Sequence, residues 1–140
     1  MRAEAFLDTN VLIYAFAKDD PRAEVAERLL EAGGAVSVQV LNEFVAVARR
    51  KLQMPWSEVV DALAAIRLLC GAPLPLTAED HDAAIEIAQQ HGYTIYDAMI
   101  VATAMQAGCR TLYSEDMQDG RRFDLRIEIK NPFAAEGQSR

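Results

Sequence analysis

Short apolar runs alternate with longer amphipathic segments along the chain. Four runs read as strands, at residues 3–7, 35–38, 111–113 and 126–129. Between them, apolar residues recur at helical spacing. The predicted helices cover about residues 9–17, 21–32, 39–52, 58–70, 77–91 and 94–106. Strands that alternate with helices are typical of an α/β domain with a mainly parallel central sheet and helices on both faces.

Polar residues with capping preferences mark where several of these helices begin. Thr9-Asn10 predicts the start of the first helix, and Asp20 followed by Pro21 predicts the start of the second. Thr77, with acids two and three residues later, predicts the start of a later helix. Gly33-Gly34 predicts the end of the second helix, because glycine readily adopts the conformation that ends a helix.

Length and composition indicate an ordinary globular protein. The chain has 140 residues, 51% of them hydrophobic and 25% charged, which excludes a disordered tail protein, a collagen-like fibre and a coiled-coil rod. This length fits one domain. We predict a domain over residues 1–133 and a loose tail over residues 134–140.

The charge balance argues against one class of function. Lys and Arg number 14 and Asp and Glu number 21, giving a formal net charge of −7. Non-specific DNA-coating proteins need excess cations to neutralise phosphates, so this class is not expected. A local site can still carry the opposite field once it binds a metal ion.

Neither a leader nor a membrane span is expected. The first apolar run stops at Asp8, too soon for a signal peptide, and no run reaches the roughly 20 residues that cross a bilayer. Cys70 and Cys109 are isolated and set among apolar residues, as expected of reduced thiols. These features predict a cytoplasmic protein without membrane contact.

Five acidic residues occupy positions that a solvated surface does not explain. Asp8 directly ends the first strand, and Asp116 and Asp119 follow a late strand. Glu43 shares a helix face with Val40 and Val47, and Asp97 shares one with Ile100 and Val101. In an α/β sheet the ligand site lies beyond the carboxyl ends of the strands, so we expect acids there to converge.

Each acid also has a structural interpretation. Asp8 can cap a helix, Asp97 can be the third residue of a helix capped by Thr94, and the two loop acids can serve turns. As a group, however, they lack sequence-near lysines, since the chain has only Lys18, Lys51 and Lys130. Converging carboxylates raise one another's pKa unless a cation joins them. Their hard oxygen ligands favour Mg²⁺ or Mn²⁺, which can activate water and stabilise a phosphodiester transition state.

Four ordered segments carry a resemblance to a known family. The residues Phe6-Leu7-Asp8-Thr9-Asn10-Val11-Leu12, Asn42-Glu43-Phe44, Tyr96-Asp97-Ala98-Met99-Ile100-Val101 and Thr111-Leu112-Tyr113-Ser114-Glu115-Asp116 resemble the motifs of PIN domains. The likeness spans about residues 4–133, and the most similar members are expected to be bacterial VapC-type toxins of toxin–antitoxin pairs. Membership implies a three-layer α/β/α fold and an endoribonuclease that depends on Mg²⁺ or Mn²⁺. It also implies an RNA substrate, a homodimer and inhibition by a small antitoxin protein.

The resemblance assigns roles to individual residues. It implies that Asp8, Glu43, Asp97 and Asp116 are both the catalytic residues and the metal ligands. Ser114 and Asn10 match the polar positions that support these acids. Asp119 lies in the same loop as Asp116, so it is a second candidate for the fourth ligand.

Two basic clusters follow the acid-bearing segments. They consist of Arg49, Arg50 and Lys51, and of Arg121 and Arg122. They can contact the phosphates of RNA, or they can simply be charges at a helix end and in a loop.

Two other functions compete with a nuclease. A PIN fold that binds RNA or protein without cleaving it is one, although the full set of acids argues against it. A phosphotransfer protein is the other, but a haloacid-dehalogenase pattern needs an aspartate at position 10, where this chain has Asn10. Thr9 and the inward Glu43 do not fit a receiver domain, and no Gly-rich phosphate loop occurs.

Overall fold

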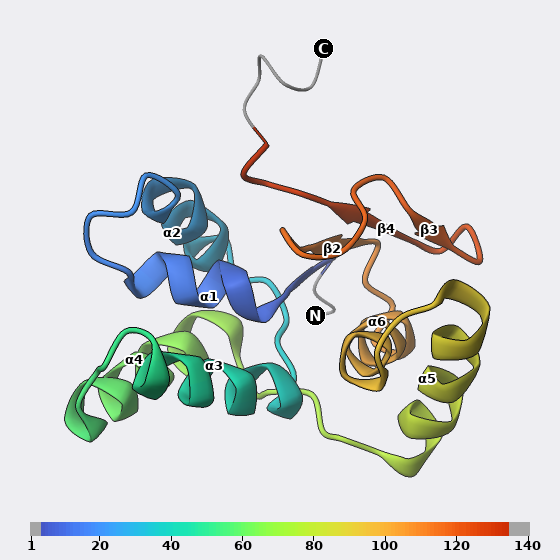
Figure 1. The fold of residues 1–140 in the computed structure, drawn as a ribbon, viewed down its shortest axis with the longest axis horizontal. Coiled ribbons are helices and arrows are strands. Elements are labelled where there is room, and N and C mark those ends of the chain that lie inside the picture. Colours follow the sequence, from blue (N-terminus) through green and yellow to red (C-terminus); the bar gives the residue numbers. More distant parts are fainter. Residues whose placement is uncertain (1–3, 135–140) are drawn as a thin grey trace.

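The computed structural model describes residues 4–134, and its helices and strands follow the predicted α/β order (Figure 1). The elements are β1 (Ala5–Leu7), α1 (Thr9–Phe16), α2 (Ala23–Glu31), α3 (Val38–Arg50), α4 (Trp56–Cys70), α5 (Ala78–His91), α6 (Ile95–Gln106), β2 (Thr111–Tyr113), β3 (Arg122–Phe123) and β4 (Ile127–Lys130).

The four strands form one sheet in the order β1-β2-β4-β3. The pairs β1–β2 and β2–β4 are parallel, while β3 runs antiparallel to β4. The predicted fold class, α/β with a mainly parallel sheet, is therefore confirmed. Leu7 lies opposite Tyr113, so the residues that follow β1 and β2 emerge at the same edge of the sheet.

The helices form two groups around this sheet. Figure 1 shows α1 to α4 gathered on the left and α5 paired with α6 below β2, β3 and β4. Phe6, Leu112 and Ile129, one from each parallel strand, are fully buried and join the main apolar core with Phe44 of α3. Burial of these large apolar side chains stabilises the packing of the strands against the helices.

Two helix starts differ from the prediction. Asp8, not Thr9 or Asn10, caps α1, because its side chain accepts a hydrogen bond from the Thr9 backbone N–H, as the structural interpretation of Asp8 predicted. Helix α2 begins at Ala23 rather than at residue 21. Asp20 Oδ1 accepts from the Arg22 N–H at 2.8 Å, so this segment is a turn that precedes the helix.

One predicted strand is much reduced, and one strand was missed. Residues 35–38 form only the bridges Phe6–Ala35 and Ser37–Leu74, because Ser37 already caps α3. The missed strand, β3, has only two residues, too few for an alternation of apolar and polar positions to show.

Two further predictions concern the C-terminal tail and the absence of a membrane span. The proposed tail falls almost entirely on residues 135–140, which lie outside the described residues, so the domain boundary stays a prediction. Among the helices described, none combines the length and the apolar character that a membrane span requires.

Candidate functional site

Asp8 is the buried centre of the acidic site. Its side chain is 4% exposed at the carboxyl end of β1. Ser114, which directly follows β2, donates its hydroxyl to Asp8 Oδ2 at 2.7 Å, and the Thr9 N–H donates to Oδ1 at 2.7 Å. Asp8 therefore caps α1 and also links the ends of two neighbouring strands.

Asn10 connects this centre to the loop after β2. Its Nδ2 donates to Asp8 Oδ2 at 3.4 Å and to Asp116 Oδ2 at 3.2 Å, while its Oδ1 accepts from the Glu115 N–H at 3.2 Å. One amide thus bridges two of the predicted metal ligands. Asn10 and Ser114, the two residues predicted to support the acids, therefore both donate to Asp8.

Glu43 reaches the site from α3. The Thr9 hydroxyl donates to Glu43 Oε1 at 2.8 Å, and Gln39 donates to Oε2 at 3.2 Å. Gln39 also donates to the Tyr96 carbonyl at 2.7 Å, so α3 is tied to the beginning of α6. Thr9 and Gln39 were not among the predicted site residues. The position of Gln39, one turn before Glu43, is the sequence signal that points to it.

Asp97 completes the set from the first turn of α6. Its backbone N–H donates to the Thr94 hydroxyl at 3.1 Å, as expected of a capped helix. Burial raises the pKa of the half-buried Asp97 carboxyl, and the charges of Glu43 and Asp116 raise it further. The Asp97 carboxylate accepts no hydrogen bond from residues 4–134, in contrast to the other three acids.

The four acids interact electrostatically with one another. Burial raises the pKa of Asp8 to about 7, hydrogen bonds from Ser114 and Thr9 oppose this rise, and Asp97 and Glu43 add to it. Within the described residues, none of the four acids forms an ion pair with a basic side chain. A raised pKa is expected where carboxylates lie close together and no cation neutralises them.

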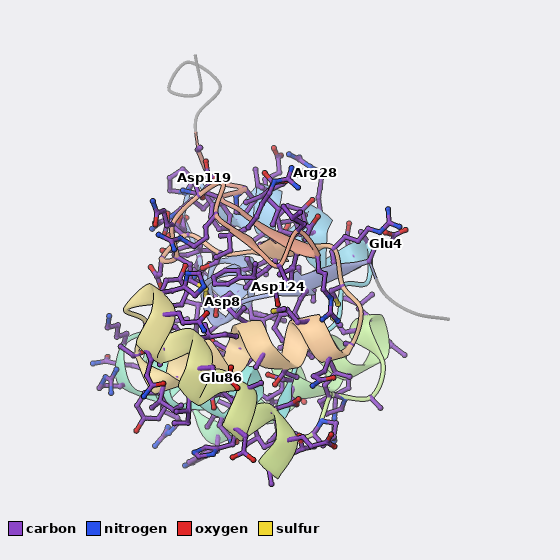
Figure 2. All side chains as sticks on the ribbon, turned by 90° about the vertical axis from the view of Figure 1, so that its right-hand side faces the viewer. Glu4, Asp8, Arg28, Glu86, Asp119 and Asp124 are labelled. Carbon is purple, nitrogen blue, oxygen red and sulfur yellow. The ribbon has the colours of Figure 1, made fainter. Side chains whose placement is uncertain are left out.

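The other acids of the loop point elsewhere. Glu115 forms an ion pair with Arg22 at 3.1 Å and accepts a short hydrogen bond from the Tyr14 hydroxyl. Asp119 accepts from the Asn131 N–H at 2.8 Å, and Figure 2 shows it well apart from Asp8. Of the three loop acids, only Asp116 has a carboxylate that accepts from the same Asn10 amide as Asp8.

The predicted basic residues are mostly engaged away from the acids. Arg49 donates to the Met54 carbonyl and lies over the Trp56 ring, and Arg50 is exposed on α3. Arg121 contacts Gln118 and His91, and Arg122 pairs with Glu128 at 3.1 Å. Lys51 is the exception, because it lines a cavity of about 390 Å³ together with Thr9, Asn10, Glu43 and Asp116.

The donor set suits a hard divalent cation. The four acids and the Thr9, Ser114 and Asn10 side chains that hold them present oxygen ligands, without a thiolate or imidazole. As they stand, no three of the Asp, Glu, His and Cys side chains in residues 4–134 are arranged to hold one metal ion. Ligation therefore requires the carboxylates to reorient, and Asp97, whose carboxylate accepts no hydrogen bond, is the least restrained of them.

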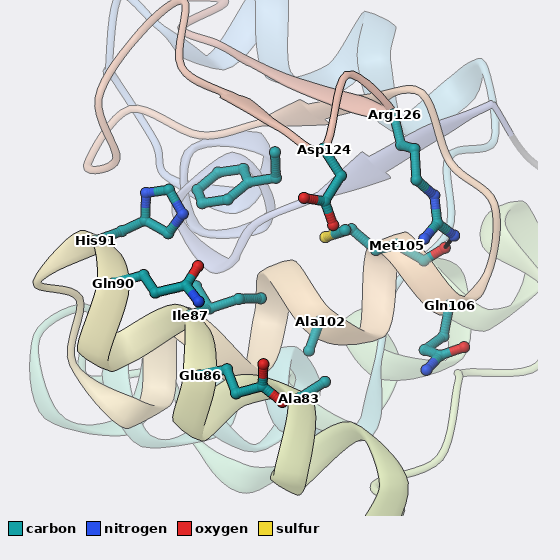
Figure 3. A pocket seen from close by; sticks show the side chains of 11 residues that line it. Ala83, Glu86, Ile87, Gln90, His91, Ala102, Met105, Gln106, Asp124 and Arg126 are labelled. Atoms are coloured by element: carbon teal, nitrogen blue, oxygen red, sulfur yellow. Dashed lines mark hydrogen bonds between the residues drawn. The ribbon is translucent and has the colours of Figure 1, made fainter.

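A second cavity lies away from the acids. It has a volume of about 280 Å³ between α5, α6 and the turn that joins β3 to β4 (Figure 3). Its polar lining consists of Glu86, Gln90, His91, Gln106, Asp124 and Arg126. None of the predicted catalytic or metal-binding residues lines this cavity.

Comparisons with known proteins confirm the resemblance to PIN domains. The model of the PIN domain matches residues 5–122. No curated protein gave a match. Among solved structures, the chain is similar to the VapC20 toxin of Mycobacterium tuberculosis, described as cleaving the sarcin-ricin loop, with 28% identity, a TM-score of 0.65, and coverage of 80% of this chain and 89% of that one.

Two further structures share the fold at lower identity. A toxin–antitoxin complex from Klebsiella pneumoniae matches with 19% identity and a TM-score of 0.71, covering 94% of this chain and 99% of that one. FitAcB from Neisseria gonorrhoeae matches with 23% identity and a TM-score of 0.67, again over 94% and 99% of the two chains.

Proposed function

The chain belongs to the PIN domain family, and we propose that it is a metal-dependent endoribonuclease that serves as the toxin of a toxin–antitoxin pair. One observation carries the proposal. Carboxylates from three other segments lie around the buried Asp8, and no basic residue described pairs with any of the four acids. Burial raises the pKa of Asp8, and the charges of Asp97 and Glu43 raise it further. Such an arrangement suits binding of a divalent cation and is poorly suited to structural stabilisation.

The similar structures support the substrate and the partner. The Mycobacterium tuberculosis protein is a toxin that cleaves the sarcin-ricin loop, and the Klebsiella pneumoniae structure is a toxin–antitoxin complex. By analogy, this chain takes RNA as its substrate and a small antitoxin as its inhibitor. We also propose a homodimer, a cytoplasmic location and a nuclease domain over residues 1–133.

Asp8, Glu43, Asp97 and Asp116 are the proposed ligands of Mg²⁺ or Mn²⁺. With a divalent ion bound there, the site would gain a water of lowered pKa and stabilisation of the charge that develops on the phosphodiester. Hydrogen bonds within the chain already orient two of these proposed ligands. Ser114 and the Thr9 N–H orient Asp8, and the Thr9 hydroxyl orients Glu43.

Asn10 has a positioning role in this proposal. Its amide donates to both Asp8 and Asp116 and so links a proposed ligand that directly follows β1 to one in the loop after β2. Lys51, which lines the same cavity, is proposed to hold a substrate phosphate beside the acids. The fourth ligand is assigned to Asp116 because Asp119 is directed to Asn131.

The test is cleavage by the purified protein. A mixed RNA pool is incubated with Mg²⁺, with Mn²⁺ and with EDTA, and the cut ends are mapped. We expect cleavage only with metal, and loss of cleavage in Asp8→Asn, which retains an acceptor for Ser114. Undiminished cleavage by metal-stripped protein would contradict the mechanism. Binding without cleavage under every condition would instead support the inactive RNA-binding module.

A further inference from the structure

Three arginines line a groove at one end of the parallel strands, and the acids lie at the other end. Arg110 precedes β2, Arg126 precedes β4, and Arg122 begins the antiparallel β3. Together with Leu125 and Glu128 they line a cavity of about 600 Å³, here called the arginine groove. None of the acids assigned to catalysis contributes to it.

The groove concentrates positive charge on an acidic chain. Its lining contains three arginines and one glutamate, a local charge of +2, whereas the whole chain carries −7. A polyanion is repelled by most of such a molecule and is attracted only where cations outnumber acids. The arginine groove is such a place.

Two of the three guanidinium groups are available to a ligand. Arg122 forms a 3.1 Å ion pair with Glu128. Arg110 reaches Glu4 only at 3.8 Å, with both side chains about four-fifths exposed, and such surface pairs exchange readily. The guanidinium of Arg126 bonds to the Met105 carbonyl at 3.3 Å and pairs with no carboxylate of residues 4–134.

The turn beside the groove has an unusual backbone. Asp124 and Leu125 both have positive φ, 54° and 56°, in the connection between β3 and β4. Leucine rarely adopts this conformation, and its side chain here is 87% exposed. This tight turn places Arg126 just before β4, on the groove that Arg110 also lines.

The groove and the acids lie at opposite ends of the same strands. Figure 2 shows Glu4 and Asp8 separated along β1, and Arg110 lies at the Glu4 end. With three residues in β2, the sheet alone separates the two ends by about 10 Å. Phosphates bound in the arginine groove therefore lie away from the acids, and a folded RNA, whose phosphates lie on more than one strand, can present phosphates to both ends of the sheet.

We propose that Arg110 and Arg126, supported by Arg122, bind backbone phosphates of a folded RNA whose cleaved strand lies among the acids. This inference rests on the proposed function and specifies its substrate class. The guanidinium group of arginine can donate two parallel hydrogen bonds to the oxygens of a phosphate. Because these phosphates lie away from the cleavage site, the arginine groove favours structured RNA over short oligonucleotides.

Binding without cleavage provides the test. In EDTA, fluorescence anisotropy compares a labelled stem–loop RNA with a short unstructured oligoribonucleotide, using the parent chain and R110A/R126A. The matched control is R28A/R67A, which removes two exposed arginines from α2 and α4. We expect R110A/R126A to weaken stem–loop binding about tenfold. The slope of the logarithm of the binding constant against the logarithm of the salt concentration should decrease by an amount that corresponds to the loss of up to two phosphate contacts. The control and the short oligonucleotide should change less than twofold.

Several results would overturn the inference. One is equal weakening of stem–loop binding by the two double variants, and another is no weakening by R110A/R126A. A third is that polyglutamate displaces the stem–loop RNA preferentially, which would identify the groove as a surface for acidic proteins. If R110A/R126A melts below the parent, Arg126→Gln, which still donates to Met105, replaces Arg126→Ala. Failure of the parent to cleave RNA with metal contradicts the proposed function, whereas the binding comparison in EDTA tests the groove itself.

Discussion

Arg22 Nη1 and Glu115 Oε2 lie 3.1 Å apart although the two residues are 93 positions apart in the sequence. The same guanidinium lies over the Tyr14 ring, 3.7 Å from its centroid, and also bonds to both oxygens of Asp20. Glu115 sits between Ser114 and Asp116, which serve the acidic site. The ion pair therefore anchors the loop that carries the proposed fourth metal ligand and turns Glu115 away from it.

Removal of this anchor should destabilise the protein. We expect Arg22→Ala to lower the free energy of unfolding by about 1–2 kcal/mol, because two carboxylates and a ring contact lose their partner. Denaturant unfolding measures the loss. Arg28→Ala is the matched control, since its exposed pair with Glu24 is worth no more than about 0.5 kcal/mol. Equal losses in the two variants would show that Arg22 is an ordinary surface residue.

Asp97→Asn should stabilise the metal-free protein. Burial and the charges of Glu43 and Asp116 raise the pKa of Asp97, so its ionised form is costly. Removing one charge should gain about 1 kcal/mol, or roughly 3 °C in melting temperature. The loss of a negative charge in the first turn of α6 opposes this gain by a few tenths of a kcal/mol.

Thermal melts of the parent and Asp97→Asn, in EDTA and in Mg²⁺, give the four values needed. Mg²⁺ should stabilise the parent by binding only its folded state, and it should stabilise the variant less. Cleavage should fall steeply in the variant. A lower melting temperature in EDTA with an unchanged Mg²⁺ response would assign Asp97 to the helix start alone.

Some of the site follows directly from local sequence. Asp8 ends the first strand and Ser114 follows a later one, and parallel pairing of β1 with β2 brings them to one edge, as expected. Asp97 lies in the first turn after Thr94, a placement that helix capping alone predicts. These residues were found because their positions depend on where a strand or helix ends.

Other contacts depend on how the helices pack, which the local pattern does not encode. The Thr9 hydroxyl meets Glu43 only because α1 lies beside α3, and Gln39 reaches the Tyr96 carbonyl only because α3 approaches α6. The Arg22–Glu115 pair likewise depends on the placement of α2. The pattern along the chain identifies the charged residues but not their distant partners.

Asp116 and Asp119 should respond differently to loss of charge. In Asp116→Asn the amide oxygen still accepts from Asn10, but a proposed ligand is lost, so cleavage should fall by more than about tenfold. In Asp119→Asn the side-chain oxygen still accepts from the Asn131 N–H, so stability and cleavage should change little. Mg²⁺ titrations followed by melting temperature compare the two variants. A weakened response in Asp119→Asn alone would reverse the assignment.

The stability of the metal-free protein should fall as pH rises. Burial raises the pKa of Asp8 from an ordinary 3.8 to about 7. Between these values the folded state binds more protons than the unfolded state, so the free energy of unfolding decreases with increasing pH. The contribution is complete below about pH 4 and is lost as pH rises through 7. A shift of about three pH units corresponds to no more than about 4 kcal/mol.

Metal binding should reverse part of this loss. A divalent cation binds the carboxylate and not the carboxylic acid, so Mg²⁺ should raise the melting temperature more at about pH 8 than at about pH 5.5. Melts of the parent, Asp8→Asn and the exposed control Asp61→Asn at both pH values, with EDTA or Mg²⁺, separate Asp8 from all other titrating groups. In EDTA, Asp8→Asn should lose much of the parent's pH dependence, while Asp61→Asn should keep it. If Asp8→Asn and the parent respond identically to pH, Asp8 is ionised throughout this range and the acids around it do not act as one cluster.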